Sequence, residues 1–195
     1  MSESKVYTIF AGVNGAGKST FHKVLDRDFG IRINLDEIIR DQFGNEWRSP
    51  KIQMSAGRIA VRLIKDCLNG DSSFNQETTL TGRTILSNIA RAKVNGFKIV
   101  LYYVGLESVE LSIERVAKRV ANGGHGISEE DLRRRFTSSF ENLKTALPLC
   151  DSVYIYDNSK DNVRGVLNPL VILLNGKVEY LEKDCPQYLR DVFGM

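Results

Sequence analysis

Short runs of apolar and β-branched residues alternate along the chain with longer segments whose apolar positions recur every three or four residues. Residues 97–104 form the most continuous apolar run, which is typical of a strand buried on both faces. The segment 49–67 has a clear helical period, with apolar side chains at Ile52, Ala56, Ile59, Leu63 and Cys67. This alternation predicts an α/β fold, a three-layer sandwich with a parallel central sheet and helices on both faces.

Capping residues, glycines and prolines set the boundaries of the other elements. Ser49 and Pro50 mark the start of one helix, and Ser128 caps another that follows a glycine-rich break over 122–126. We predict further strands over 5–11, 32–34, 73–78 and 153–157, and further helices over 18–28, 83–95 and 109–121.

The C-terminal part of the chain carries a different signal. Asn175-Gly176 lies between the apolar runs 170–174 and 177–181, and Asn-Gly in this setting is a strong indication of a β-hairpin. A helix is predicted over 186–193. Because no long linker or internal repeat interrupts the pattern, we predict a single domain over 1–195, with residues 161–195 as a C-terminal hairpin and helix appended to the core.

Composition narrows the class of protein. The 195 residues are 42% hydrophobic and 26% charged, which is typical of a globular domain and argues against a disordered or collagen-like chain. The longest apolar runs, such as 170–174, are far shorter than the roughly 20 residues of a membrane helix, so no membrane partner is expected. The net charge of +3 is too small to indicate a nucleic-acid partner.

The cysteines and histidines bear on metal binding and location. Cys67, Cys150 and Cys185 are odd in number and lack the spacing of a zinc or redox motif, which indicates free thiols in a reducing compartment. With only His22 and His125 besides, no transition-metal site is expected. Because the N-terminal residues show no basic segment with a hydrophobic signal core, we expect a cytoplasmic protein.

The segment Gly12-Val-Asn-Gly-Ala-Gly-Lys-Ser-Thr20 matches the P-loop pattern, with a predicted strand before it and a predicted helix after it. Its glycines let phosphate approach the backbone, whose N–H groups point at the anion. The Lys18 ammonium supplies charge to the terminal phosphates, and the Ser19 hydroxyl can ligate Mg²⁺. The residues expected to hold the nucleotide are Gly12, Asn14, Gly15, Ala16, Gly17, Lys18, Ser19 and Thr20.

A P-loop indicates a nucleotide and Mg²⁺ but leaves the phosphate acceptor undefined. The chain has no Asn-Lys-x-Asp motif that would read guanine, which disfavours GTP. The second predicted strand also lacks a hydrophobic run that ends in a clear Walker B aspartate. A small phosphotransferase is the reaction class that these features favour.

Two polar segments follow the second and third predicted strands, at the edge where open α/β sheets bind ligands. Asp36 can take the proton from an attacking hydroxyl or can simply cap the helix that begins there, and its neighbour Glu37 is an alternative base. Glu77 can orient Mg²⁺ through water or hold a sugar hydroxyl, and Thr79 can hydrogen-bond the acceptor. Helix capping is the alternative role for both.

Basic residues form a third candidate group. Arg115 and Arg119 are four residues apart on one predicted helix, and Arg133, Arg134 and Arg135 follow the glycine-rich break. Because arginine stabilises charge on a transferred phosphoryl group, we expect at least one of the five to act from a helical lid that closes over the nucleotide.

Two polar residues in loops are weaker candidates. His125 lies among glycines and is interpreted as a loop histidine without a catalytic role. Asn158 follows the last core strand, where it can form part of a wall for the nucleotide base or only a turn.

Taken in order, these segments resemble the zeta toxin family of P-loop kinases. The resemblance is carried by 12–20, 33–38, Glu77-Thr-Thr-Leu80, and 114–127 together with 131–136, and residues 1–160 form the core that it covers. It implies an ATP- and Mg²⁺-dependent kinase. The best-known members phosphorylate the 3′-hydroxyl of the sugar in UDP-N-acetylglucosamine and related UDP-amino sugars, and an antitoxin covering the nucleotide site is the protein partner to expect.

The resemblance also implies roles for individual residues. Lys18 and Ser19 hold phosphate and metal, Asp36 is the base, and Glu77 and Thr79 lie at the substrate. Arginines of the 115–135 segment stabilise the transferred group. We assign Arg119 and Arg135 as catalytic, Arg115 to the nucleotide and Arg134 to the acceptor.

Other functions stay open at this point. The chain can be a kinase of another metabolite or of a nucleic-acid end, or a nucleotide-binding interaction protein controlled by an antitoxin-like partner. A nucleic-acid end should require a basic track with stacking aromatics, whereas 133–135 is a short basic run and Trp47 is the only tryptophan. The presence of Lys18, Ser19 and Asp36 together favours turnover.

Overall fold

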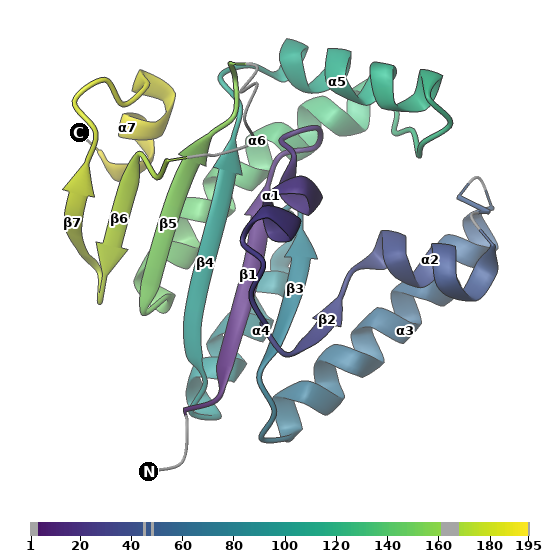
Figure 1. The fold of residues 1–195 in the computed structure, drawn as a ribbon, viewed down its shortest axis with the longest axis horizontal. Helices are drawn as coiled ribbons and strands as arrows, with labels where there is room; N and C mark the ends of the chain where they lie inside the picture. Colours follow the sequence, from purple (N-terminus) through teal and green to yellow (C-terminus); the bar gives the residue numbers. More distant parts are fainter. Residues whose placement is uncertain (1–3, 45, 48, 161–167, 195) are drawn as a thin grey trace.

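The computed structural model describes residues 4–44, 46–47, 49–160 and 168–194, and this part of the chain forms one central sheet with helices packed on it (Figure 1). In their order across the sheet the strands are β2 (Ile31–Ile33), β3 (Phe74–Thr78), β1 (Val6–Gly12), β4 (Lys98–Gly105), β5 (Ser152–Asp157), β6 (Val171–Leu174) and β7 (Lys177–Leu181). The first five of these pair in parallel, which confirms the predicted parallel sheet.

The predicted hairpin is present as β6 and β7, with Asn175 and Gly176 at the positive φ values that its turn requires. β6 pairs antiparallel with β5, so the hairpin continues the central sheet. Val171 and Leu173 of β6 are buried in the main core. Residues 161–167, where the predicted C-terminal segment starts, lie outside the described residues.

The helices follow the predicted pattern with two local differences. They are α1 (Lys18–Val24), α2 (Leu35–Phe43), α3 (Pro50–Asn69), α4 (Arg83–Val94), α5 (Val109–Ala121), α6 (Glu129–Ala146), the 3₁₀ turn η1 (Leu147–Leu149) and α7 (Gln187–Phe193). The helix predicted over 18–28 ends early, because the chain turns at Asp26 with a φ of 40°. Ser49 precedes α3 but makes no capping hydrogen bond, whereas Ser128 Oγ accepts from the Asp131 N–H as predicted.

Both faces of the sheet are covered. Tyr7 and Ile9 of β1 join the main core, which α3, α4, α6 and α7 complete. Phe10, which points to the opposite face, packs with Phe21 of α1 in a second core. Figure 1 shows α1 in front of the sheet and α4 and α6 behind it. None of the described helices is both long and apolar enough to cross a membrane.

The strand register places the site. β1 and β3 are parallel neighbours, with Phe10 opposite Glu77 and Ala11 opposite Thr78. Because both strands run the same way, the P-loop after β1 and the segment 77–79 at the end of β3 emerge side by side at the carboxyl edge of the sheet.

Candidate active site

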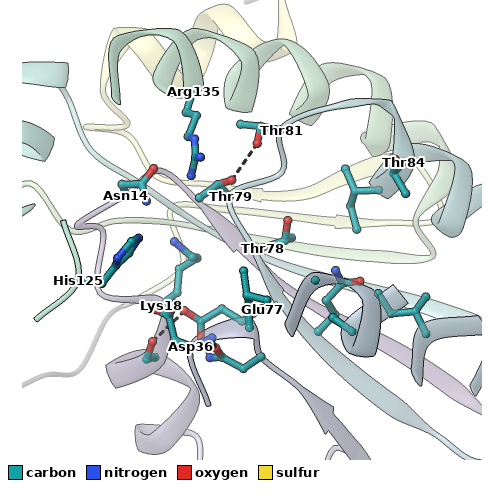
Figure 2. Close-up of a pocket in the computed structure, with 18 of the residues that line it drawn as sticks. Asn14, Lys18, Asp36, Glu77, Thr78, Thr79, Thr81, Thr84, His125 and Arg135 are labelled. Atoms are coloured by element: carbon teal, nitrogen blue, oxygen red, sulfur yellow. Dashed lines mark hydrogen bonds between the residues drawn. The ribbon is translucent and has the colours of Figure 1, made fainter. Parts of the chain in front are cut away.

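A pocket of about 810 Å³ lies at this carboxyl edge (Figure 2). We call one part the phosphate end; it is lined by Asn14, Gly15, Gly17, Lys18, Ser19, Thr20, Asp36, Glu77, Arg115, Arg119, His125 and Arg135. The other part is the α3–α4 arm, lined by Gly57, Ala60, Val61, Ile64, Lys65, Leu68, Thr84, Ile85, Asn88 and Arg91. Thr78, Thr79 and Thr81 lie between them. Figure 2 shows Asn14 and His125 on one side and Thr84 on the other.

Lys18 is a buried cation at the phosphate end, with an exposed fraction of only 9%. Its Nζ donates to the carbonyl oxygens of Gly12 and Val13 at 3.0 and 3.1 Å. Burial lowers the pKa of the Lys18 ammonium, and the negative charges of Glu77 and Asp36 oppose that shift. An anion entering the pocket would favour the charged form in the same way as these carboxylates do.

The P-loop conformation depends on a glycine at its start. Gly12 has a φ of 141°, and a Cβ built there would lie 2.1 Å from the backbone oxygen of Val104 on β4. No other residue type fits without a backbone shift, because the neighbour is main chain and not a flexible side chain. Gly12 thus lets the start of the P-loop run close alongside the backbone of β4.

Contacts from distant segments hold the P-loop from outside the pocket. Ser112 Oγ of α5 donates to the Asn14 carbonyl at 2.7 Å, and Asn158 Nδ2 after β5 donates to the Ala16 carbonyl at 3.0 Å. Asn158, Gly12 and Ala16, all predicted to bind the nucleotide, are not among the residues that line the pocket. These residues support the P-loop without lining the pocket.

Glu77 is the centre of a hydrogen-bond network at the end of β3. Its carboxylate accepts from Ser19 Oγ at 2.8 Å, from Arg32 Nη2 at 2.9 Å and from Asn34 Nδ2 at 2.8 Å. Arg32 also pairs with Glu37 at 3.0 Å. Sequence reasoning missed the contacts of Arg32 and Asn34 with Glu77, because only the pairing of β2 with β3 brings these residues together.

Asp36 was predicted either to act as a base or to cap the helix that begins there, and its neighbour Asn34 takes the capping position. Asn34 Oδ1 accepts from the backbone N–H groups of Asp36 and Glu37, so Asn34 is the N-cap of α2. Asp36 lines the pocket near Lys18 (Figure 2), whereas Glu37 is turned to Arg32 and is not a lining residue. Asp36 is therefore the carboxylate of α2 that lines the pocket.

Thr79 is held in the pocket by a short chain of contacts. Its hydroxyl shares a hydrogen bond of 2.9 Å with the hydroxyl of Thr81. Asn142 of α6 donates to the carbonyl oxygens of Leu80 and Gly82 at 2.9 and 3.0 Å, which fixes the connection from β3 to α4. Both threonines line the pocket.

The predicted arginines divide into two groups. Arg115, Arg119 and Arg135 line the phosphate end, while Arg134 pairs with Asp131 at 2.5 Å on the exposed side of α6. Arg133 pairs with Glu110 and Glu129 and is also outside the pocket. The helical period separates neighbours in sequence, so Arg134 and Arg135 point in different directions.

Two polar atoms at the phosphate end lack a partner. Among the described residues, Asn14 Oδ1 and Arg119 Nη2 are the buried side-chain nitrogen and oxygen atoms without a hydrogen bond. Arg119 is otherwise held through Nε, which donates to the His125 carbonyl at 3.0 Å. Because buried polar atoms are normally paired, this Nη2 donor is available to a hydrogen-bond acceptor that enters the pocket.

His125 lies in the pocket, although the sequence pointed to a loop histidine without a catalytic role. Its ring centroid is 6.1 Å from that of Trp47, which precedes α3. Burial lowers the pKa of His125, an effect that the charge of Asp36 opposes and the charges of Arg119 and Arg135 reinforce.

The described residues contain no cluster of three or more His, Cys, Asp or Glu side chains able to hold a metal. Cys67, Cys150 and Cys185 are buried and form no disulfide, as predicted. A cation at the phosphate end would depend on Ser19, Glu77 and the ligand's own oxygens.

The arrangement of the parallel strands, the P-loop and the lining arginines is that of a P-loop kinase fold. A similar fold is found in a chain from the PezAT chromosomal toxin–antitoxin system of Streptococcus pneumoniae, with a TM-score of 0.59 and 17% identity over 98% of this chain and 77% of that one. It is also found in an AvrRxo1-ORF1:AvrRxo1-ORF2 structure with sulphate ions, with a TM-score of 0.67 and 14% identity over 96% of this chain and 63% of that one.

Sequence comparison identifies the family. The model described as Zeta toxin matches residues 1–164, and the chain therefore belongs to the Zeta toxin family. An uncharacterized protein of Haemophilus influenzae is 33% identical over 127 residues, which are 65% of this chain and 89% of that protein.

Proposed function

We propose that this protein is an ATP- and Mg²⁺-dependent kinase that transfers the γ-phosphoryl group to a hydroxyl of a small molecule. The observation that carries the proposal is the convergence of Lys18, Asp36 and the unpaired Nη2 donor of Arg119 on one pocket. A phosphate cradle alone serves many reactions. A carboxylate facing the same cavity adds the proton acceptor that a hydroxyl nucleophile needs.

In this mechanism the P-loop and Lys18 bind the phosphates of ATP, and Asp36 accepts the proton of the attacking hydroxyl. Arg119 and Arg135 stabilise the negative charge on the phosphoryl group in transit, and Arg115 binds the nucleotide. These groups act mainly by positioning and electrostatic stabilisation, the terms that dominate phosphoryl transfer. A similar fold in a structure of AvrRxo1-ORF1:-ORF2 with ATP, with a TM-score of 0.65 and 15% identity, supports ATP as the donor.

Mg²⁺ fits the oxygen donors at this end of the pocket. The Ser19 hydroxyl would be a ligand, and Glu77, already hydrogen-bonded to it, would act directly or through water. One or two protein oxygens are enough, because Mg²⁺ in kinases keeps several waters and uses substrate phosphates as ligands. When bound, the ion neutralises charge on the β- and γ-phosphates.

The leading acceptor is a UDP-amino sugar such as UDP-N-acetylglucosamine, on the strength of membership in the Zeta toxin family. Glu77, Thr79 and Thr81 would then lie beside the sugar. Arg134, assigned to the acceptor from sequence, is replaced in this proposal by residues of the pocket, because its side chain is paired on the surface.

A protein partner is also proposed. Similar folds occur in structures of the PezAT toxin–antitoxin system and of AvrRxo1-ORF1 with AvrRxo1-ORF2. By analogy, an antitoxin-like protein would cover the phosphate end and block nucleotide entry. The purified chain should therefore be assayed without other proteins of its source.

The test is incubation with Mg²⁺-ATP and a panel of UDP-sugars, read by mass spectrometry. We expect one added phosphate on UDP-N-acetylglucosamine, lost in Asp36→Ala and on chelation of Mg²⁺. Asp41→Ala is the matched control, because Asp41 is on the same helix but pairs with Arg40 at the surface. Transfer that survives in Asp36→Ala would exclude Asp36 as the base. ATP binding with no phosphorylated UDP-sugar would exclude this acceptor class.

A further inference from the structure

The α3–α4 arm is part of the pocket that the proposed chemistry at the phosphate end does not use. One helix stripe forms its wall: Gly57, Val61, Ile64 and Leu68 of α3 recur at the spacing of a single helical face. A different face of α3, with Ala56, Ile59 and Leu63, packs against α2 in its own core cluster. The arm wall is therefore a second apolar face of the same helix.

This wall is only partly covered. Ile64 and Leu68 are buried, whereas Val61 is 60% exposed although it lines a concave site. Ile85 of α4, which is also buried in the main core, lines the arm as well. An apolar side chain that lines a cleft and remains exposed, as Val61 does, is typical of a surface that a ligand covers.

Gly57 gives the arm its width. It lies inside the 20-residue helix α3, where glycine is an unfavourable residue. A Cβ at this position would meet no atom within 4 Å, so close packing does not require the glycine. The missing side chain keeps the space next to Val61 open.

The charged side chains that line the arm in the described part of the chain, Lys65 and Arg91, are both positive. The lining of the arm includes Lys65, Asn88 and Arg91, while the two carboxylates that line the pocket in the described part of the chain, Asp36 and Glu77, are at the phosphate end. Arg91 is held near the end of α3 by a hydrogen bond of 2.6 Å to Asn69 Oδ1. A ligand in the arm thus meets an apolar wall and then hydrogen-bond donors.

We propose that the α3–α4 arm recognises the part of the acceptor that lies away from the reacting hydroxyl. It selects a flat or aliphatic group that covers Val61, Ile64 and Ile85 and that presents carbonyl oxygens or negative charge to Lys65, Asn88 and Arg91. Gly57 is the specificity-determining position. This proposal rests on the proposed kinase function only in identifying the ligand of the arm as the acceptor. Binding to the arm can itself be tested without turnover.

The direct test uses 8-anilinonaphthalene-1-sulfonate, a flat apolar ring system with one anionic group, as the probe. With the phosphate end filled by Mg²⁺-ADP, we expect saturable binding of one probe per chain, detected by its fluorescence. Gly57→Leu should weaken probe affinity about ten-fold or more, since roughly four carbons would enter the space that the rings occupy. Arg58→Leu, next along α3 and outside the pocket lining, should change it less than about two-fold.

A second pair of variants covers the case in which Gly57→Leu fails to fold. Val61→Asp should weaken the probe at least as much, because it puts negative charge on the apolar wall. Val94→Asp is its control, since Val94 is 85% exposed on α4 and is not a lining residue. Equal probe affinity in the wild type, Gly57→Leu and Val61→Asp would overturn the proposal.

Transfer assays separate this proposal from the proposed function. If the protein is a kinase and the arm binds the acceptor, Gly57→Leu raises the acceptor KM and leaves the KM for ATP unchanged. If transfer is absent for every acceptor while the probe still responds to Gly57→Leu and Val61→Asp, the kinase proposal fails and the binding site stands. Normal transfer with an unchanged acceptor KM in Gly57→Leu would reject the arm alone.

Discussion

At the phosphate end of the pocket, hydrogen bonds join segments far apart in the chain, whereas the α3–α4 arm is lined mostly by apolar side chains of two helices. Glu77 alone connects the P-loop with β2 and the start of α2 through Ser19, Arg32 and Asn34. In the arm, the wall residues Gly57, Val61 and Ile64 have no polar side-chain atoms, so they can contact a ligand only by packing against it. Charged transition states need groups fixed in advance, while an apolar wall can change its outline by single substitutions. If the proposed function holds, substitutions at the phosphate end should impair phosphoryl transfer itself, whereas substitutions in the arm should change which acceptor is preferred.

The largest expected effect is at the phosphate end. Lys18→Ala should lower phosphoryl transfer by about 100-fold or more and weaken ATP binding, because it removes the buried cation that faces the phosphates. Titration calorimetry with ATP and a transfer assay measure the two effects. Lys23→Ala, an exposed lysine on the same helix, is the control and should behave as the wild type. A normal rate and affinity in Lys18→Ala would contradict the assignment of this end to phosphate.

The arginines offer a sharper test within one segment of the chain. Arg119→Ala should reduce kcat about 10- to 100-fold, because its Nη2 is a buried donor without a protein partner. Arg134→Ala should change kcat less than about two-fold, since exposed ion pairs such as that with Asp131 contribute little. Steady-state kinetics of both variants decide this. The reverse order of effects would show that α6 approaches the nucleotide with its other face.

The phosphate end and the α3–α4 arm also differ in how the replacement of a glycine should change the stability of the protein. Gly12→Ala should lower the free energy of unfolding by more than about 1 kcal/mol, because its Cβ would collide with the Val104 backbone. Gly57→Ala should raise it by up to about 1 kcal/mol, because alanine favours the helix and the position is open. Urea unfolding measures both changes. A loss of stability in Gly57→Ala would mean that the arm is tighter than described.

The smallest expected effect is a pH response at the mouth of the phosphate end. Burial lowers the pKa of His125 below its ordinary value of 6.5. Between the lowered pKa and pH 6.5, the ring is therefore neutral in the folded protein but protonated in the unfolded chain. The contribution of His125 to stability is thus present above pH 6.5 and lost as the pH falls through its folded pKa.

Trp47, the only tryptophan, reports on this titration because its ring packs near His125. Its fluorescence should be constant above pH 6.5 and change only below it, and His125→Asn should remove the change. His22→Asn, which alters the other histidine, should leave it in place. A transition at or above pH 6.5 would contradict the inferred burial of His125.

Local chemistry determined much of this protein from the sequence by itself. The P-loop, the Asn175-Gly176 turn and the periodicity of 109–121 each depend on neighbouring residues, and each predicted element is present. Family membership could also be predicted, because the family motifs occur in order along the chain. The predicted length of α1 was wrong, because the residues around the turn at Asp26 give no strong local indication that the helix ends there.

Tertiary structure decided which side chains share the pocket. Strand pairing brought Arg32 and Asn34 to Glu77, and helix rotation turned Arg135 inward and Arg134 outward. Only the structure showed that Asn34 caps α2 and that Asp36 lines the pocket. Neither the arm nor the open space at Gly57 could be predicted, because a cavity is formed by the distance between elements and not by the residues of any one of them. Sequence periodicity fixes the face of a helix that is apolar, whereas the packing of the other elements decides whether that face is covered or left open to a ligand.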